Sequence, residues 1–118
     1  MGALVLLALL AGCDEGDVGE GRLLVEGDPE NGRRLIARLG CGACHVIPGV
    51  KGARGRVGPS LDGFSRQGYI AGEFPNRAPM LIRWITEAPA LSPRTAMPAS
   101  ALTEREARDV ASYLYRLE

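Results

Sequence analysis

The 118-residue sequence predicts an all-α domain with three main helices. One observation is a pair of clear helix-start signals, at Asp28-Pro29 and at Thr103. Another is that apolar residues recur at helical spacing in the second half of the chain. The third is that no segment between the helices shows the alternation of a half-buried strand. The length leaves room for a single domain.

The first helix is expected over residues 29–39. Asp28 is a good N-cap, and Pro29 occupies the first helical position, where its missing N–H is not needed. Gly40 then provides the usual C-terminal stop.

The second helix is expected over residues 79–88, with Pro89 ending it. Its apolar positions are Leu81, Ile82, Trp84, Ile85 and Ala88. The third helix begins with a capping box, Thr103 to Glu106. Its apolar stripe consists of Ala107, Val110, Ala111, Leu114 and Leu117.

Residues 45–76 are predicted to be mostly loop, which is long for a compact domain. The chain also has only six aromatic residues among many glycines and prolines. A domain of about 90 residues with so few large side chains has difficulty filling a core. We therefore expect a non-protein group to fill part of the interior.

The charges are unevenly distributed although the formal net charge is zero. Residues 14–30 carry seven acidic side chains and one basic side chain, whereas residues 31–118 carry thirteen basic and seven acidic ones. An acidic leader thus precedes a basic domain. Nothing in this balance indicates nucleic acid as a partner, and we expect a monomer.

The N-terminal segment resembles a bacterial lipoprotein signal. Residues 2–11 are an apolar run that is too short to span a bilayer, and Leu10-Ala11-Gly12-Cys13 resembles a lipobox. This predicts a signal peptide over residues 1–12, lipid on Cys13, a flexible acidic tether over residues 13–27, and a folded domain over residues 28–118. An ordinary secretory leader is the alternative, and the lack of a basic residue at the start departs from the usual pattern.

Cys41-Gly42-Ala43-Cys44-His45 carries the chemistry. Two thiols separated by two residues can form thioethers with the vinyl groups of one haem, and the next histidine can bind the iron. A thioredoxin-like pair would require a βαβ pattern, which is lacking. A closed structural zinc site would require four ligands, and the motif offers three. We therefore predict one covalent haem c with His45 as an axial ligand.

Met97 is the predicted second axial ligand. It lies between Pro93 and Pro98, and Pro98 favours an extended backbone at Met97, so the thioether is expected on a stiff loop. Met80 lies near a helix start, where packing is its ordinary role. An open, five-coordinate iron is the remaining alternative.

Together these motifs resemble class I cytochrome c over residues 28–118. The resemblance implies the class I fold, with three main helices and loops around one haem. It gives Pro59 the carbonyl that accepts the proximal histidine's N–H, and it gives Trp84 an indole that binds a haem propionate, although core packing is an alternative. It also pairs Gly32 with Tyr113 where the first and last helices cross. Ala78 departs from the family, which usually has Thr or Ser before Pro79.

The resemblance implies electron transfer rather than enzymatic activity. We expect a shuttle or small subunit of a respiratory chain, anchored by lipid to the periplasmic face of the membrane, with a terminal oxidase or dehydrogenase as partner. A peroxidase or gas-sensing domain with five-coordinate haem is the alternative function. Basic side chains near the haem motif could steer this face to an acidic partner: Arg33, Arg34, Arg38, Lys51, Arg54, Arg56 and Arg66. Arg66, Tyr69, Asn76 and Arg77 are further candidate propionate partners.

Overall fold

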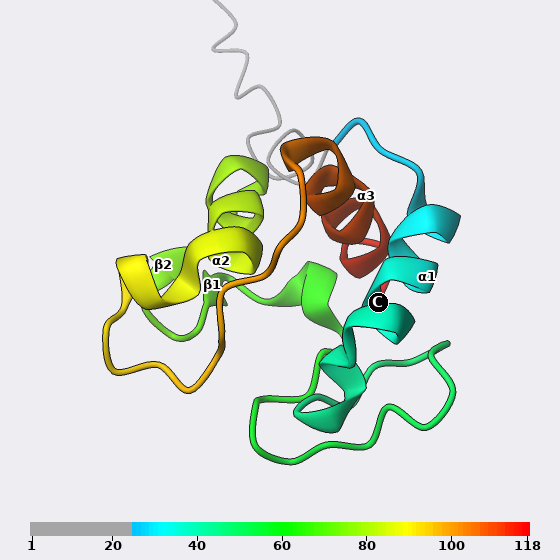
Figure 1. The fold of residues 1–118 in the computed structure, drawn as a ribbon, viewed down its shortest axis with the longest axis horizontal. Helices are drawn as coiled ribbons and strands as arrows, with labels where there is room; N and C mark the ends of the chain where they lie inside the picture. Colours follow the sequence, from blue (N-terminus) through cyan, green and yellow to red (C-terminus); the bar gives the residue numbers. More distant parts are fainter. Residues whose placement is uncertain (1–24) are drawn as a thin grey trace, which may run out of the picture.

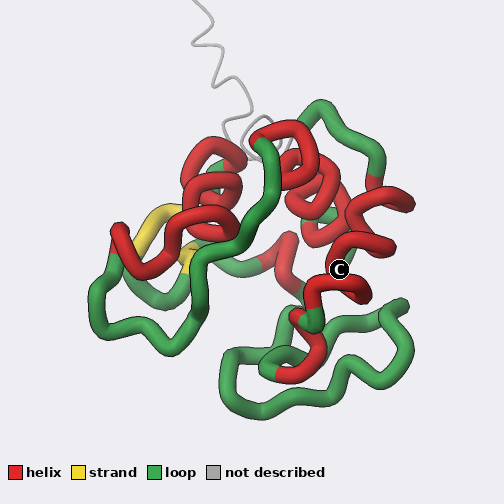
Figure 2. Tube along the Cα trace, viewed as in Figure 1, coloured by secondary structure: helices red, strands yellow, loops and turns green. Residues whose placement is uncertain are grey.

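The computed structural model describes residues 25–118. It contains three α-helices, as predicted: α1 (Pro29–Leu39), α2 (Ala78–Leu91) and α3 (Glu104–Leu114). α1 and α3 lie side by side, α2 packs on α3, and long loops close the lower part of the molecule (Figure 1). Loops and turns make up most of the chain outside the helices (Figure 2).

Both ends of α1 are as the sequence predicts. The Asp28 carboxylate accepts hydrogen bonds from the backbone N–H groups of Glu30 (2.9 Å) and Asn31 (3.1 Å). Gly40 ends the helix in the left-handed conformation, with φ 72°. This conformation costs glycine little because it has no Cβ.

The predicted capping box of α3 is also present. The Thr103 hydroxyl accepts from the N–H of Glu106 at 3.2 Å, and the Glu106 carboxylate accepts from the N–H of Thr103 at 2.9 Å. The helix ends at Leu114, three residues before the last member of the predicted stripe. Leu117 is nevertheless buried in the core.

α1 and α3 touch backbone to backbone at Gly32. A Cβ at this position would overlap the Asp109 carbonyl and lie 3.0 Å from the Cα of Val110. The prediction of a close crossing at Gly32 is therefore correct, but the facing surface is helix backbone. Tyr113 lies one turn further along α3, where its hydroxyl donates to the carbonyl of Pro48 at 2.6 Å. The tyrosine thereby attaches the loop after the Cys-His motif to α3.

The predicted end of the second helix at Ala88 lies within one residue of a break in α2, but the expectation that Pro89 ends the helix is wrong. The helix is broken at Glu87 (φ −139°, ψ 33°) and resumes for a final turn that includes Pro89 and ends at Leu91. The break explains how proline is tolerated, because Pro89 lies in the first turn of the resumed segment and not in the interior of a continuous helix. At the other end, Arg77 is the N-cap and its side chain makes no capping hydrogen bond, in line with the departure at Ala78.

The segment between His45 and Asn76 is more ordered than predicted. It contains a 3-10 turn, η3 (Phe64–Arg66), and an antiparallel pair, β1 (Tyr69–Ile70) with β2 (Phe74–Pro75). We expected no strands, and strands of two residues are too short to show alternation in the sequence.

Asn76 holds the end of this segment in place. It is 1 % exposed, and its amide donates to the carbonyls of Phe64 (3.3 Å) and Gln67 (2.8 Å). Its carbonyl oxygen accepts from the Tyr115 hydroxyl at 3.0 Å. The Asn76 side chain, which was proposed as a propionate partner, is therefore hydrogen-bonded to other residues of the protein.

The predicted signal peptide, Cys13 and most of the predicted tether lie outside the described residues. Two residues that precede Asp28, the predicted start of the domain, also contact the domain. Val25 packs against the core, and the Gly27 carbonyl accepts from the Ser112 hydroxyl at 3.4 Å. None of the helices within residues 25–118 is long and apolar enough to cross a membrane.

Candidate functional site

A cavity of about 400 Å³ lies between the helices and the loops, and its wall is mostly apolar. This volume is within the range of about 300–1,000 Å³ that is usual for small-molecule and cofactor sites. Six of the predicted haem-site residues in the described part of the chain line this cavity: Cys41, Cys44, His45, Pro59, Trp84 and Met97.

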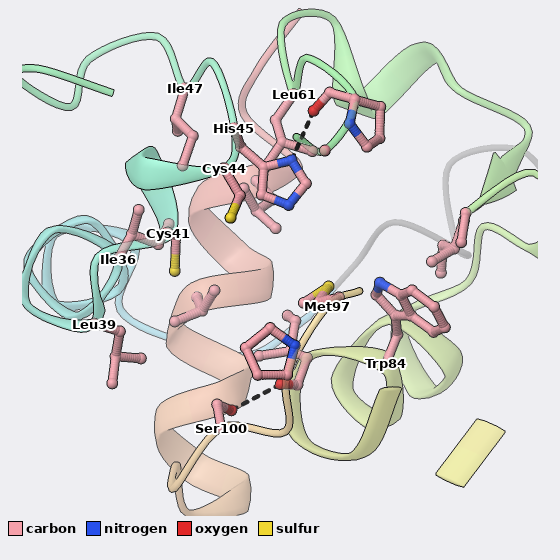
Figure 3. Close-up of a pocket in the computed structure, with 18 of the residues that line it drawn as sticks. Ile36, Leu39, Cys41, Cys44, His45, Ile47, Leu61, Trp84, Met97 and Ser100 are labelled. Carbon is pink, nitrogen blue, oxygen red and sulfur yellow. Dashed lines mark hydrogen bonds between the residues drawn. The ribbon is translucent and has the colours of Figure 1, made fainter. Parts of the chain in front are cut away.

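The Cys-His motif forms one tight turn directly after α1. The left-handed Gly40 redirects the chain into the 3-10 helix η2 (Cys41–Ala43). The N–H groups of Cys44 (3.2 Å) and His45 (3.0 Å) both bond to the carbonyl of Cys41. The turn thereby places both sulfurs on one side of the cavity, with the imidazole next to them (Figure 3).

The loop after the motif folds back against it through glycine. A Cβ at Gly42 would lie 2.6 Å from the Cα of Ala53, and the Gly55 N–H donates to the Gly42 carbonyl at 3.0 Å. Our reading of the sequence did not assign this role to Gly42 or Gly55. The sequence indicates the role only through position, because Gly42 lies within the motif and Gly55 shortly after it. Glycine is so common in this chain that this indication is weak.

His45 is held in a defined tautomer. Its Nδ1 lies 2.7 Å from the carbonyl oxygen of Pro59. Because a carbonyl can only accept, Nδ1 must carry the proton, which leaves the lone pair on Nε2. Nε2 points into the cavity (Figure 3). The imidazole therefore presents a metal-binding nitrogen to a group bound in the cavity.

Gly58 allows this loop to approach the imidazole. A Cβ at position 58 would lie 2.7 Å from Nδ1 and 2.9 Å from Nε2 of His45. The N–H of Gly58 also donates to the carbonyl of Cys44 at 2.8 Å. Glycine at 58 and the carbonyl at 59 thus act together to orient the ring.

Met97 lies across the cavity from His45 (Figure 3). It is on the loop between α2 and α3, and its N–H donates to the Thr95 hydroxyl at 3.2 Å. Met80, the other methionine of the domain, packs against the core and does not line the cavity. Of these two thioethers, only that of Met97 is placed to face His45.

Trp84 forms part of the opposite wall. It is 8 % exposed and packs against Phe74, with ring centroids 5.8 Å apart. The proposed propionate partners Arg66, Tyr69, Asn76 and Arg77 do not line the cavity. The polar lining instead includes three residues that we did not predict: Gln67, Thr95 and Ser100.

The thioredoxin-like alternative lacks its fold, because the strands within residues 25–118 form one short antiparallel pair and no βαβ unit. The pKa of the Cys41 thiol is raised, mainly by burial and also by the nearby Cys44, although a backbone hydrogen bond lowers it. Redox-active thiols have a lowered pKa, because the thiolate is the nucleophile.

Direct zinc binding is not supported either. Within residues 25–118, no group of three or more His, Cys, Asp or Glu side chains is arranged to hold a metal ion. The donors are instead spread around a large apolar cavity, which fits a porphyrin: two thiols on one turn, an imidazole nitrogen beside them and a thioether opposite. Fold and site together define an α-helical protein of the c-type haem class.

Comparison with known proteins gives the family. The cytochrome c family model matches residues 29–118. The structure is similar to the crystal structure of the c-type cytochrome SorU from Sinorhizobium meliloti, with a TM-score of 0.53 and 24 % sequence identity. The likeness covers 83 % of this chain and 92 % of that one. No match was found among curated proteins.

The chain therefore belongs to the cytochrome c family, and the class I fold is confirmed. Its cofactor is a covalently bound haem c, and its chemistry is haem-based electron transfer.

Proposed function

We propose that this protein is a mono-haem electron carrier with His45 and Met97 as axial ligands of the iron. The position of Met97 across the cavity from the Nε2 of His45 carries this proposal. Bound haem supplies a one-electron couple, and a thioether ligand favours the ferrous state. Pro59 and Gly58 fix the imidazole, while the mostly apolar wall limits access of water. A carrier of this kind needs no substrate site.

An optical spectrum of the purified holoprotein tests the ligation. We expect a low-spin spectrum with the weak sulfur-to-iron charge-transfer band of methionine ligation in the oxidised form. Met97→Ala should lose this band. Met80→Ala is the matched control and should keep it, because Met80 packs against the core away from the cavity. A Met97→Ala protein that kept the band would refute the assignment, and a high-spin wild type would favour the five-coordinate alternative.

We also propose that the protein works in a respiratory chain, as a shuttle or small subunit tethered to the periplasmic face of the membrane by lipid on Cys13. The apolar leader and the Leu10-Ala11-Gly12-Cys13 sequence support this anchor. The proposed location agrees with the cofactor, because c-type cytochromes are typically extracytoplasmic. Mass spectrometry of the mature protein tests it: a diacylglyceryl group on an N-terminal Cys13 is expected, and an unmodified Cys13 would contradict the anchor.

The partner is proposed to present an acidic surface, as a terminal oxidase or dehydrogenase subunit could. The cavity rim includes Val57, whose side chain is 73 % exposed. The same loop carries the exposed basic residues Lys51, Arg54 and Arg56, which take part in no salt bridge within the described chain. Such a face combines an apolar contact with electrostatic steering.

Stopped-flow electron transfer to a candidate partner tests the docking face. The association rate should fall as salt is added, and it should fall further in Lys51→Ala/Arg54→Ala/Arg56→Ala. Arg77→Ala/Arg105→Ala/Arg116→Ala serves as a control that removes the same charge, because these exposed arginines also take part in no salt bridge within the described chain and lie outside the loop after the motif. Equal rates at low and high salt would rule out the steering.

A further inference from the structure

The break in α2 leaves a backbone carbonyl without its usual helical partner. In a continuous helix the N–H of residue 89 would donate to the carbonyl of residue 85. Pro89 has no N–H, and the helix is interrupted at Glu87. Ile85 itself is buried, so its carbonyl requires another donor.

Ser100 supplies that donor from the neighbouring loop. Its hydroxyl donates to the carbonyl of Ile85 at 2.7 Å, and its N–H donates to the carbonyl of Thr86 at 3.3 Å. The Thr86 hydroxyl does not compete, because it bonds to the carbonyl of Ile82 at 3.0 Å. Two bonds from one residue thus join the loop to the broken end of α2.

This loop is the one that carries Met97. Ser100 lies three residues after Met97, and both line the haem cavity. Figure 3 shows the bond between the Ser100 hydroxyl and the α2 carbonyl beside the Met97 side chain. At the other end of the loop, the Thr95 N–H donates to the carbonyl of Ser92 at 3.0 Å. Without the Ser100 bonds, the segment after Met97 would lose its attachment to α2.

We propose that Ser100 is a positioning residue for Met97, and that its attachment at the Pro89 break opposes dissociation of the methionine from the iron. This inference rests on the proposed His45/Met97 ligation. The hydroxyl bond contributes the stability of one ordinary net hydrogen bond, which corresponds to about a fivefold change in the open population of the loop. Ser100→Ala should therefore raise the methionine-off population about fivefold.

Displacement of Met97 by free imidazole measures that population in the oxidised holoprotein. Imidazole binds the iron only after the methionine has left, so its apparent affinity rises in proportion to the open state. We expect imidazole to bind Ser100→Ala about fivefold more tightly than wild type. Binding is monitored through the loss of the sulfur-to-iron band. Ser100→Thr retains a hydroxyl and should return the affinity toward the wild-type value.

Ser92→Ala is the matched control, because Ser92 is half-buried on the same loop and its side chain makes no hydrogen bond within residues 25–118. Its imidazole affinity should equal that of the wild type. Denaturant unfolding of all four proteins separates a general loss of stability from a local one.

Two results would overturn the inference. If Ser100→Ala lowered the unfolding midpoint but left the imidazole affinity unchanged, Ser100 would stabilise α2 without positioning Met97, while the proposed ligation would stand. If the wild type itself lacked the sulfur-to-iron band, the proposed ligation would fail, and this inference with it.

Discussion

Gly58 offers a direct test of how the protein sets the electronic character of its proximal histidine. Gly58→Ala would place a Cβ 2.7 Å from the Nδ1 of His45, whereas ordinary contacts begin at 3.4 Å. The same Cβ would overlap Cε1 of the ring even more closely, so the ring and the loop must separate by about 1 Å. Pro59 is next in the same loop, so its 2.7 Å bond to Nδ1 stretches beyond hydrogen-bonding distance.

The loss of this bond has a predictable sign. A hydrogen bond from Nδ1–H makes the imidazole a stronger electron donor, which favours ferric iron over ferrous iron. Its loss should therefore raise the midpoint potential. One net hydrogen bond is worth about 1 kcal/mol. For a one-electron couple, this corresponds to a rise of about 40 mV.

A spectroelectrochemical titration measures this shift. Gly68→Ala is the matched control, because a Cβ there meets nothing within 4 Å and its φ lies outside the left-handed region. The control should keep the wild-type potential, and Gly58→Ala should raise it. An unchanged or lower potential in Gly58→Ala would refute the argument that Gly58 and Pro59 orient and polarise the ring.

Three further predictions concern the framework around the site. Gly32→Ala should destabilise the fold by about 1–3 kcal/mol in denaturant unfolding, because its Cβ would overlap the Asp109 carbonyl across the α1–α3 contact; unchanged stability would contradict the close crossing. Asp109 is 6 % exposed, and hydrogen bonds from the Asp28 N–H and the Asn31 amide, both 2.7 Å, lower its pKa. A lowered folded-state pKa gives stability that is full above the unfolded-state pKa and is lost as pH falls through the folded value. Asp109→Asn should therefore cost about 1–3 kcal/mol at neutral pH and lose less stability than wild type on acidification, and parallel pH profiles of stability would refute this. Tyr113→Phe removes the bond to the Pro48 carbonyl and should cost about 1 kcal/mol, with faster amide exchange in residues 46–53; equal exchange rates would show that the hydroxyl does not hold the loop.

The parts of the structure that sequence reasoning predicted well are governed by short-range chemistry. Helix starts at Asp28 and Thr103 depend on side chains that bond to backbone N–H groups within three residues. The Cys-His motif likewise fixes its own geometry within one turn. These signals require no knowledge of distant segments, so the sequence alone reveals them.

Long-range contacts account for what the sequence did not reveal. Asn76 looked like a propionate partner because polar residues near a haem often have that role, yet its amide is bonded to the carbonyls of Phe64 and Gln67. The sequence analysis did not single out Asp109, yet its carboxylate accepts a hydrogen bond from the N–H of Asp28, which lies 81 residues earlier in the chain. Neither partner could be chosen before the path of the loops was known.

The second helix shows how a local rule can be right in its physics and wrong in its outcome. Proline does remove a helical hydrogen bond at position 89, as the sequence predicts, but the helix does not simply end there. A break at Glu87 lets the chain resume, and the carbonyl that Pro89 leaves free is bonded by Ser100. The defect thus provides an attachment point for the loop that carries Met97. In a continuous helix the Ile85 carbonyl would accept a hydrogen bond from within the helix. The proline that interrupts α2 therefore leaves this carbonyl to accept the bond from the loop.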